Sequence, residues 1–153
     1  MTTNLANPYV LMIEDDPDDQ YLTRSNFKDH GYDMELKFMA DGNNLIPFLQ
    51  SCKQDHLPSL IIVDKNLPTA DGLELLRQVK SSAEFKYIPV IVVSGTMMPD
   101  DIDECYANGA NSIFQKPETD KATTDRIHAF ATYWFNVVEL PRKKTQAQIS
   151  ESY

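Results

Sequence analysis

The chain has 153 residues, with 23 acidic and 14 basic side chains and a formal charge of −9. This length is typical of one domain with one sizeable core, and the hydrophobic fraction of 42% argues against wholesale disorder. Nucleic acids and anionic membranes are poor partners for so acidic a chain, because both need a cationic surface. The sequence has no apolar run near the ~18 residues that span a bilayer, and its first residues lack the pattern of a secretion signal. These features, with Cys52 and Cys105 read as free thiols, predict a cytoplasmic protein.

Five short apolar runs along the chain predict β-strands. They lie at residues 9–13, 34–40, 60–63, 90–93 and 112–114. The first, third and fourth runs are continuously apolar, as expected for strands buried on both faces of a parallel sheet. The second run alternates apolar and charged residues at its start, which predicts an edge strand with one wet face.

Helical spacing of apolar residues predicts a helix after each strand. These helices are expected at residues 17–29, 43–52, 73–79, 100–108 and about 119–140. Pro17 suits a first helical turn, and Gly109 suits the position just after a helix end. The alternation of strands and helices predicts a doubly wound α/β domain, with a parallel sheet and helices on both faces. We expect residues 1–7 to be an extension, 8–140 to be the domain, and 141–153 to be a disordered polar tail.

Polar side chains follow four of the predicted strands. The segments are Glu14-Asp15-Asp16, Asp64-Lys65-Asn66, Ser94-Gly95-Thr96 and Gln115-Lys116-Pro117. In an open α/β sheet the ligand site lies beyond the carboxyl ends of the strands, so these groups should meet at one edge. Carboxylates packed this closely need a cation among them, and oxygen ligands without His or Cys favour Mg²⁺ over Zn²⁺. Together with Lys116 and Ser94, the ion would form a socket for a phosphoryl group, with Asp64 as the natural nucleophile.

At these positions the sequence resembles the receiver domain of two-component response regulators. The resemblance covers residues 8–138 and rests on five motifs: Glu14-Asp15, the stretch from Leu60 to Pro68, Asp71-Gly72, Ser94-Gly95 and Lys116-Pro117. It implies the flavodoxin-like strand order 2-1-3-4-5. The long last helix followed by the segment from Val137 to Pro141 is similar to that of stand-alone receivers that partner phytochrome-type and related histidine kinases.

The resemblance implies a metal site and a phosphoacceptor. Asp64 would accept a phosphoryl group from a phosphohistidine and form an acyl phosphate. Asp15, Asp64 and the backbone carbonyl of Asn66 would coordinate Mg²⁺, and Glu14 would hold the ion through water. The chain would be a signalling switch rather than a conventional enzyme, since it catalyses only its own phosphorylation and dephosphorylation.

The resemblance also implies a set of residues that respond to phosphorylation. Ser94, with Gly95 beside it, would hydrogen-bond the phosphoryl group, and Lys116 would pair with it. The bond before Pro117 would be cis, as in the family. Many receivers carry an aromatic residue three positions before the lysine, where this chain has Ile113. Phe114 cannot take over that role, because neighbouring strand residues point to opposite faces.

Several acidic and basic residues near these motifs have simpler interpretations. Asp16, Asp18 and Asp19 are expected to complement the dipole of the helix that they begin, rather than to bind the ion. Lys65 is expected to be a surface residue. The side chains of Asn66 and Thr96 either tune hydrolysis of the phosphoryl group or have no special role, and the sequence leaves both readings open.

Two other functions compete with the phosphorylatable receiver. A pure binding module of the same fold would be expected to lack an acidic, hydroxyl or lysine member of the site, and none is missing. An aspartyl phosphatase needs a second Asp where Asn66 stands, and nucleotide-binding glycine motifs do not occur. The expected partners are a sensor histidine kinase or phosphotransfer protein and a downstream protein target. The end of the last helix, residues 133–140, could also support a homodimer, because Tyr133, Trp134 and Phe135 cannot all face inward.

Overall fold

A five-stranded parallel sheet forms the centre of the protein in the computed structural model, which describes residues 8–29, 34–53, 56–116 and 120–141. The strand order is β2-β1-β3-β4-β5, as predicted. The strands are β1 (Tyr9–Ile13), β2 (Glu35–Met39), β3 (Leu60–Asp64), β4 (Val90–Ser94) and β5 (Ser112–Gln115). Each lies within one residue of its predicted bounds. All pairings are parallel, so the carboxyl ends of the strands share one edge.

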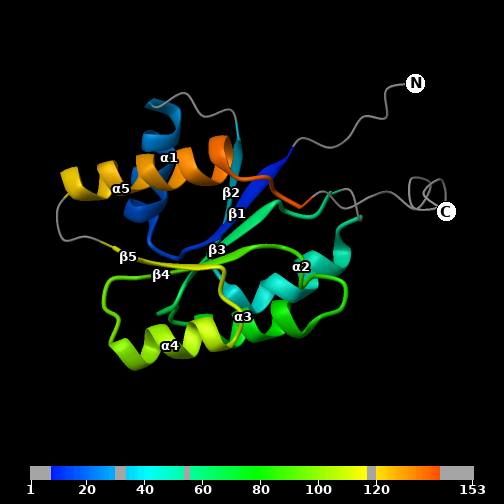
Figure 1. Cartoon of the computed structure of the whole chain (residues 1–153). Coiled ribbons are helices and arrows are strands. Elements are labelled where there is room, and N and C mark those ends of the chain that lie inside the picture. The colour runs from blue at the N-terminus through cyan, green and yellow to red at the C-terminus, as the bar shows by residue number, and fades with distance from the viewer. Residues whose placement is uncertain (1–7, 30–33, 54–55, 117–119, 142–153) are drawn as a thin grey trace, which may run out of the picture.

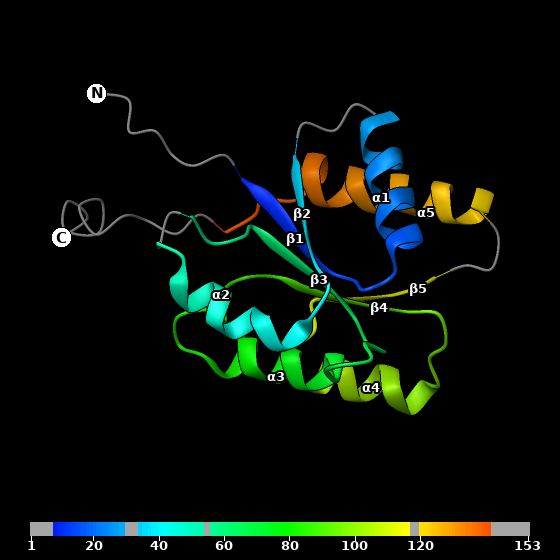
Figure 2. The same ribbon diagram turned by 180° about the vertical axis from the view of Figure 1, so that it is seen from behind.

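Helices cover both faces of this sheet (Figure 1). They are α1 (Pro17–Asp29), α2 (Leu45–Ser51), α3 (Gly72–Ser81), α4 (Pro99–Ala107) and α5 (Asp120–Thr132). A 3₁₀ turn, Gly42–Asn44, leads into α2, so that Pro47 falls in the first α-helical turn, where it is tolerated. Figure 2 shows α1 and α5 on one side of the sheet and α2, α3 and α4 on the other. This is the doubly wound arrangement that the sequence predicts.

The hydrophobic core consists of two layers, one on each side of the sheet. Strands β1, β3 and β4 are buried at every position, whereas β2 alternates between exposed and half-buried residues, as expected of an edge strand. One layer packs alternate strand residues against α2, α3 and α4, and it includes Ile113. The other packs the remaining strand residues against the aromatic side of α5, and it includes Phe114. These two neighbours therefore face opposite sides of the sheet, as predicted.

The end of the last helix differs from its prediction. A regular α-helix to residue 140 was expected, but α5 ends at Thr132 and continues as a π-helical segment, Tyr133–Val137. Trp134 and Phe135 both pack against the core layer on this side of the sheet, while Tyr133 is 52% exposed. The prediction that these three aromatic residues cannot all face inward is thus confirmed.

Some sequence-based expectations concern the parts of the chain that the structure does not describe. The extension at 1–7, the tail from residue 142 and the cis bond before Pro117 all lie outside the described residues. Within the described ranges, no helix has the length and apolar character needed to cross a membrane. Cys52 and Cys105 are free thiols, in agreement with the sequence analysis.

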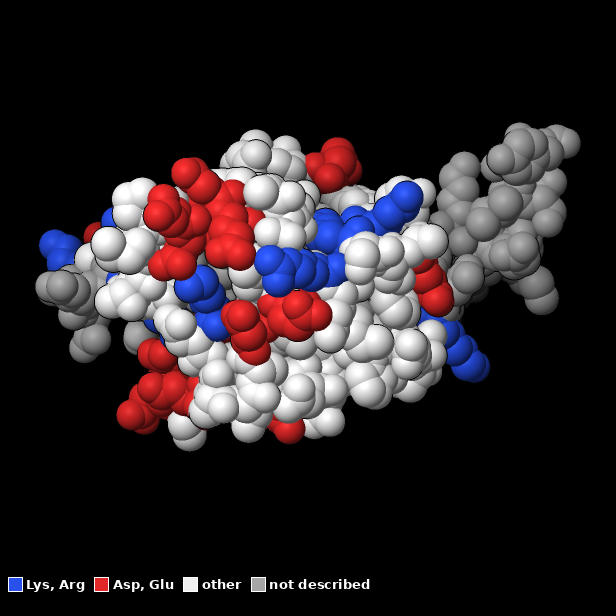
Figure 3. Space-filling model, turned by 90° about the horizontal axis from the view of Figure 1, so that it is seen from below, with Lys and Arg blue, Asp and Glu red and all other residues white. Residues whose placement is uncertain are grey.

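Charges on the face formed by α3 and α4 are mixed rather than gathered into one patch (Figure 3). Arg77 contacts both Glu74 and Glu104, and Lys65 contacts Asp101. Basic side chains on this face therefore lie beside acidic ones.

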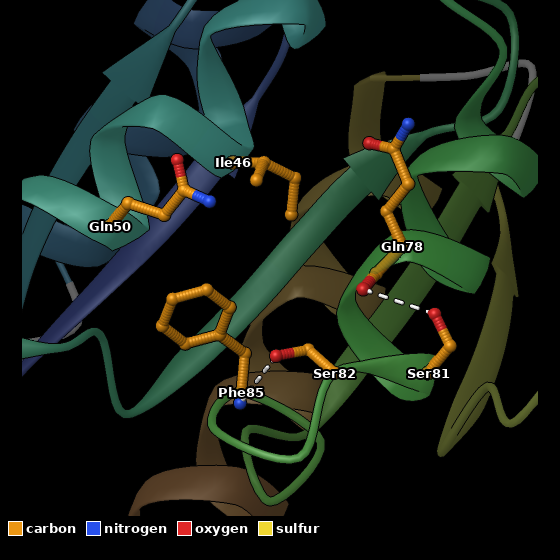
Figure 4. Close-up of a pocket in the computed structure, with 6 residues that line it drawn as sticks. All are labelled: Ile46, Gln50, Gln78, Ser81, Ser82 and Phe85. Carbon is orange, nitrogen blue, oxygen red and sulfur yellow. Dashed lines mark hydrogen bonds between the residues drawn. The ribbon is translucent and has the colours of Figure 1, made fainter.

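A shallow pocket lies between α2 and α3, at the end of α3 away from Asp64 (Figure 4). Figure 4 shows Ile46 and Gln50 of α2 facing Gln78 of α3 and Phe85 across this pocket. Its lining contains no charged residue, and none of the polar residues from the strand ends contributes to it. The polar residues that follow the strands lie at the opposite edge of the sheet from this pocket.

Candidate functional site

Three carboxylates meet at the carboxyl ends of β1 and β3. These strands are neighbours in the sheet, with Ile13 opposite Val63, so the residues that follow them come together. One oxygen from each of Glu14, Asp15 and Asp64 lies within 4.8 Å of the other two. Glu14 is 1% exposed and Asp64 is 9% exposed, whereas Asp15 faces solvent. Hard carboxylate oxygens at this spacing fit a divalent cation such as Mg²⁺ or Mn²⁺.

The burial of Glu14 has an electrostatic consequence. Removal from water raises the pKa of its carboxyl group to about 7, although the hydrogen bond and charge of Lys116 act in the opposite direction. The nearby charge of Asp64 adds to the increase. Glu14 is held in this position by its backbone amide, which donates to Met39 O at 3.0 Å and continues the pairing of β1 with β2. The fold therefore keeps a carboxyl group where its ionisation is costly unless a cation is present.

Lys116 supplies a cation to the cluster. Its Nζ donates to Glu14 Oε2 at 2.9 Å, to Asp19 Oδ2 at 2.9 Å and to Asp64 Oδ2 at 3.1 Å. Burial alone would lower the pKa of Lys116, but its hydrogen bonds to Glu14 and Asp19 and the charge of Asp64 hold that pKa well above its usual range. The ammonium group is therefore charged at neutral pH. Its backbone is fixed as well, since Lys116 N donates to Ser94 O at 2.8 Å.

Close packing of backbone explains the glycine that follows Asp71. A Cβ added to Gly72 would lie 2.6 Å from Asp64 O and 2.6 Å from Lys65 Cα, which is too close for any other residue without a shift of the backbone. The Asp71 carboxylate accepts from Leu73 N at 3.0 Å and caps α3. The start of α3 is thus pressed directly against the backbone that carries the Asp64 carboxylate.

The hydroxyl group of Ser94 is fully buried and has well-defined partners. Ser94 Oγ donates to Thr96 O at 2.8 Å and accepts from Asn66 Nδ2 at 2.8 Å. Asn66 also donates its backbone N–H to Asp64 Oδ1 at 2.9 Å. The side chain of Asn66 therefore links the Asp64 loop to the Ser94 loop, a contact that the sequence analysis did not foresee. Gly95 faces open space, since a Cβ placed there would meet nothing within 4 Å.

Two residues make contacts that the sequence analysis did not foresee. Asp19 lies in the first turn of α1 and outside the cluster of Glu14, Asp15 and Asp64, as expected, but it is also an ion-pair partner of Lys116. Lys65 was expected at the surface, but its side chain is 19% exposed and its Nζ lies 3.3 Å from Asp101 Oδ1 in the first turn of α4. The pKa of Asp101 is lower than usual mainly because its carboxylate accepts a hydrogen bond from Met98 N, and the contact with Lys65 lowers it further. The loop after Asp64 is therefore connected to α4.

Comparisons with known proteins agree with this geometry. Residues 10–128 match the response regulator receiver domain family, and the chain belongs to that family. The response regulator Rcp1 of Synechocystis sp. is 30% identical over 141 residues, which cover 89% of this chain and 96% of Rcp1. Members of this family are parts of two-component phosphorelays that interact with histidine kinases, and they are not conventional enzymes.

Solved structures show the same similarity. The crystal structure of the Mn²⁺-bound form of Rcp1 superposes with a TM-score of 0.80 at 30% identity and covers 88% of this chain and 99% of that chain. The phosphorylated cyanobacterial phytochrome response regulator RcpA superposes with a TM-score of 0.81 at 27% identity, over 89% of this chain and 99% of that chain. Together with the cluster of Glu14, Asp15 and Asp64, the first of these comparisons identifies a divalent-cation site.

Proposed function

We propose that this protein is a phosphorylation switch that accepts a phosphoryl group on Asp64 from a sensor histidine kinase or a phosphotransfer protein in the cytoplasm. The observation that carries the proposal is the contact of Lys116 Nζ with Asp64 Oδ2, at 3.1 Å, beside the carboxylates of Glu14 and Asp15. A nucleophilic carboxylate, a cation-binding cluster and a fixed ammonium group are the parts that phosphoryl transfer requires.

In this proposal each group has one task in the transfer. An oxygen of Asp64 bonds to phosphorus while the phosphorus–nitrogen bond of the phosphohistidine breaks, and its electron pair leaves with the imidazole. Asp15, Asp64 and the carbonyl of Asn66 would coordinate Mg²⁺, with Glu14 holding it through water. The ion, when bound, offsets negative charge on the phosphoryl oxygens. Lys116 stabilises the same charge from the other side.

Signal output is proposed to start at Ser94. Its hydroxyl group would leave Thr96 O and Asn66 Nδ2 and hydrogen-bond the phosphoryl group next to Gly95, and the backbone after Ser94 would follow. Ile113 packs in the core layer beneath α4, in the position where many receivers have a mobile aromatic ring. Movement of the backbone and of α4 is therefore proposed to carry the signal to a downstream protein. If Ile113→Tyr changed neither phosphorylation nor partner affinity, Ile113 would have no part in this switch.

The phytochrome class of histidine kinase is the proposed donor. RcpA is described as a phytochrome response regulator, and it resembles this chain over nearly its whole length. Purified kinase domains of this class, labelled with phosphate on histidine, should lose label to the protein faster than kinases of other two-component systems do.

The central experiment is Mg²⁺-dependent phosphorylation of the wild type and of Asp64→Asn. Intact-mass spectra after incubation with phosphoramidate should show one added phosphoryl group in the wild type and none in Asp64→Asn. Asp103→Asn, which alters an exposed carboxylate on α4, is the matched control and should behave as the wild type. Absence of labelling in the wild type with both phosphoramidate and kinases would contradict the proposal, as would full labelling of Asp64→Asn.

A further inference from the structure

We propose that Asp19 is a positioning residue for phosphoryl transfer, which acts by holding the ammonium group of Lys116. The inference rests on the proposed function and adds a residue to it. Asp19 lies in the first turn of α1, where an acidic residue would ordinarily be explained by the helix dipole alone. The contacts of its carboxylate point to a second role.

The contact between Asp19 and Lys116 is as close as the other carboxylate contacts of the Lys116 ammonium group in the described part of the chain. Asp19 Oδ2 lies 2.9 Å from Lys116 Nζ, the same distance as Glu14 Oε2 and shorter than the 3.1 Å to Asp64 Oδ2. Distances of this length are typical of charge-assisted hydrogen bonds. The Asp19 side chain is 38% exposed and that of Lys116 is 24% exposed, so the pair stands at the rim of the site.

The backbone of Asp19 is held in place by the turn in which it lies. Asp19 O accepts from Thr23 Oγ1 at 2.9 Å within α1. The next residue, Gln20, donates its side-chain amide to Glu14 O at 2.6 Å and its backbone amide to Asp16 O at 3.0 Å. These hydrogen bonds attach the first turn of α1 to the end of β1. The backbone of Asp19 is therefore fixed, and its side chain extends from this position to Lys116.

The three carboxylates around Lys116 have different roles once a divalent cation and the phosphoryl group are bound. Glu14 and Asp64 belong to the cluster with Asp15 that fits a divalent cation, and Asp64 is also the proposed phosphoacceptor. Asp19 is not a member of that cluster, so its contact with Lys116 would remain when Asp64 receives the phosphoryl group. An ammonium group has three N–H donors. Asp19 would occupy one of them and leave the other two directed toward Glu14 and the phosphoryl group.

A lysine side chain has four rotatable bonds, and its rotamer freedom opposes any fixed position of its ammonium group. A permanent partner at the rim reduces that freedom before the donor arrives. Positioning of this kind raises the rate of transfer without direct contact to the reacting phosphorus. Asp19 is therefore expected to affect the rate at saturating Mg²⁺ more than it affects ion binding.

Asp18 is a matched control for the helix-dipole explanation. It carries the same charge in the same turn of α1, it is exposed, and its backbone N–H donates to Asp16 Oδ1 at 2.9 Å. Among the described residues, the Lys116 ammonium contacts the carboxylates of Glu14, Asp19 and Asp64, and Asp18 is not one of its partners. Loss of charge at residue 18 or 19 changes the dipole interaction to a similar extent, but only loss at 19 releases Lys116.

The test compares wild type, Asp18→Asn, Asp19→Asn and Asp19→Ser for the rate of labelling by phosphoramidate at saturating Mg²⁺. We expect Asp19→Asn and Asp19→Ser to be roughly three- to tenfold slower than wild type and Asp18→Asn to be within about twofold of it. Melting curves identify any variant that fails to fold, and the second substitution at residue 19 then supplies the result. Equal rates in the Asp18 and Asp19 variants, or faster labelling without Asp19, would overturn the inference.

A spectroscopic readout distinguishes positioning of Lys116 from other effects of Asp19. The Cε signal of Lys116 in carbon–proton NMR spectra is assigned by its loss in Lys116→Gln. It should move in Asp19→Asn and stay in place in Asp18→Asn, with no donor needed. A slow Asp19→Asn with an unmoved Lys116 signal would also overturn the inference. Absence of labelling in the wild type would instead be the failure of the proposed function itself.

Discussion

The contact between α3 and the Asp64 backbone makes Gly72→Ala the sharpest test of how the fold positions the site. The added Cβ would lie 2.6 Å from both Asp64 O and Lys65 Cα, which is 0.8 Å short of the 3.4 Å at which ordinary contact begins. Both atoms belong to backbone, so no side chain can rotate away, and either α3 or the end of β3 must move.

The expected loss of stability follows from two opposing effects. Overpacking against fixed atoms costs about 1–3 kcal/mol, whereas replacing glycine by alanine in a helix contributes at most about 1 kcal/mol in the other direction. With the middle of the first range, about 2 kcal/mol, and a gain of about 0.5 kcal/mol at this first helical position, the free energy of unfolding of Gly72→Ala should fall by roughly 1–2 kcal/mol. That loss lowers the melting temperature by roughly 2–8 °C for a domain of this size. Displacement of Asp64 by a fraction of an ångström should also slow phosphorylation about tenfold or more.

Urea unfolding and phosphoramidate labelling measure these two effects. Gly95→Ala is the matched control, since its Cβ would meet nothing within 4 Å, and we expect its stability to change by less than about 0.5 kcal/mol. If Gly72→Ala were as stable and as rapidly labelled as the wild type, the close approach of α3 to Asp64 and Lys65 would not require a glycine at residue 72, and this explanation would be wrong.

Three further predictions concern the charges. Lys116→Met leaves carboxylates facing one another, so its melting temperature without divalent ions should fall, and Mg²⁺ should raise that temperature more than in the wild type. The raised pKa of Glu14 means that the folded state binds more protons than the unfolded state between pH 4.5 and about 7. In chelator, wild-type stability should therefore fall as pH rises through that interval, and urea titrations of Glu14→Gln should show a smaller fall. Asp101→Ala should speed amide exchange in the first turn of α4, where Asp101 Oδ2 accepts from Met98 N, whereas Asp103→Ala should not.

The strands and their order could be predicted because their chemistry is local. Short β-branched apolar runs such as 60–63 and 90–93 are typical of strands in the middle of a parallel sheet, and the alternating start of 34–40 indicates an edge. Once the sheet is given, the carboxyl ends of its strands bring Glu14, Asp64 and Lys116 to one edge. This part of the site follows from topology alone.

Side-chain direction at helix ends could not be predicted in the same way. Asp16, Asp18 and Asp19 all suit a first helical turn, and only the path of α1 over the sheet decides which of them reaches Lys116. The position of Lys65 against α4 likewise depends on how two loops meet. The sequence indicates that the three consecutive aromatic residues at 133–135 cannot share one face of an α-helix. It does not indicate that the helix becomes π-helical at Tyr133.

The number of charges at the rim explains why both a metal ion and a lysine are needed. Among the residues that the structure describes, the carboxylates of Glu14, Asp15, Asp19 and Asp64 gather around the ammonium group of Lys116. With every carboxyl group ionised the ion-free site has a formal charge of −3, which a divalent cation reduces to −1. In the proposed function, phosphorylation would replace the single charge of Asp64 with up to two charges on the phosphoryl group, so the site would become more negative again. The phosphoryl group would then be stabilised by nearby positive groups and hydroxyl donors. This charge balance supports the proposed movement of Ser94 toward Asp64, because the present partners of its hydroxyl group, which include Thr96 O and Asn66 Nδ2, are neutral and can be exchanged for a charged phosphoryl oxygen.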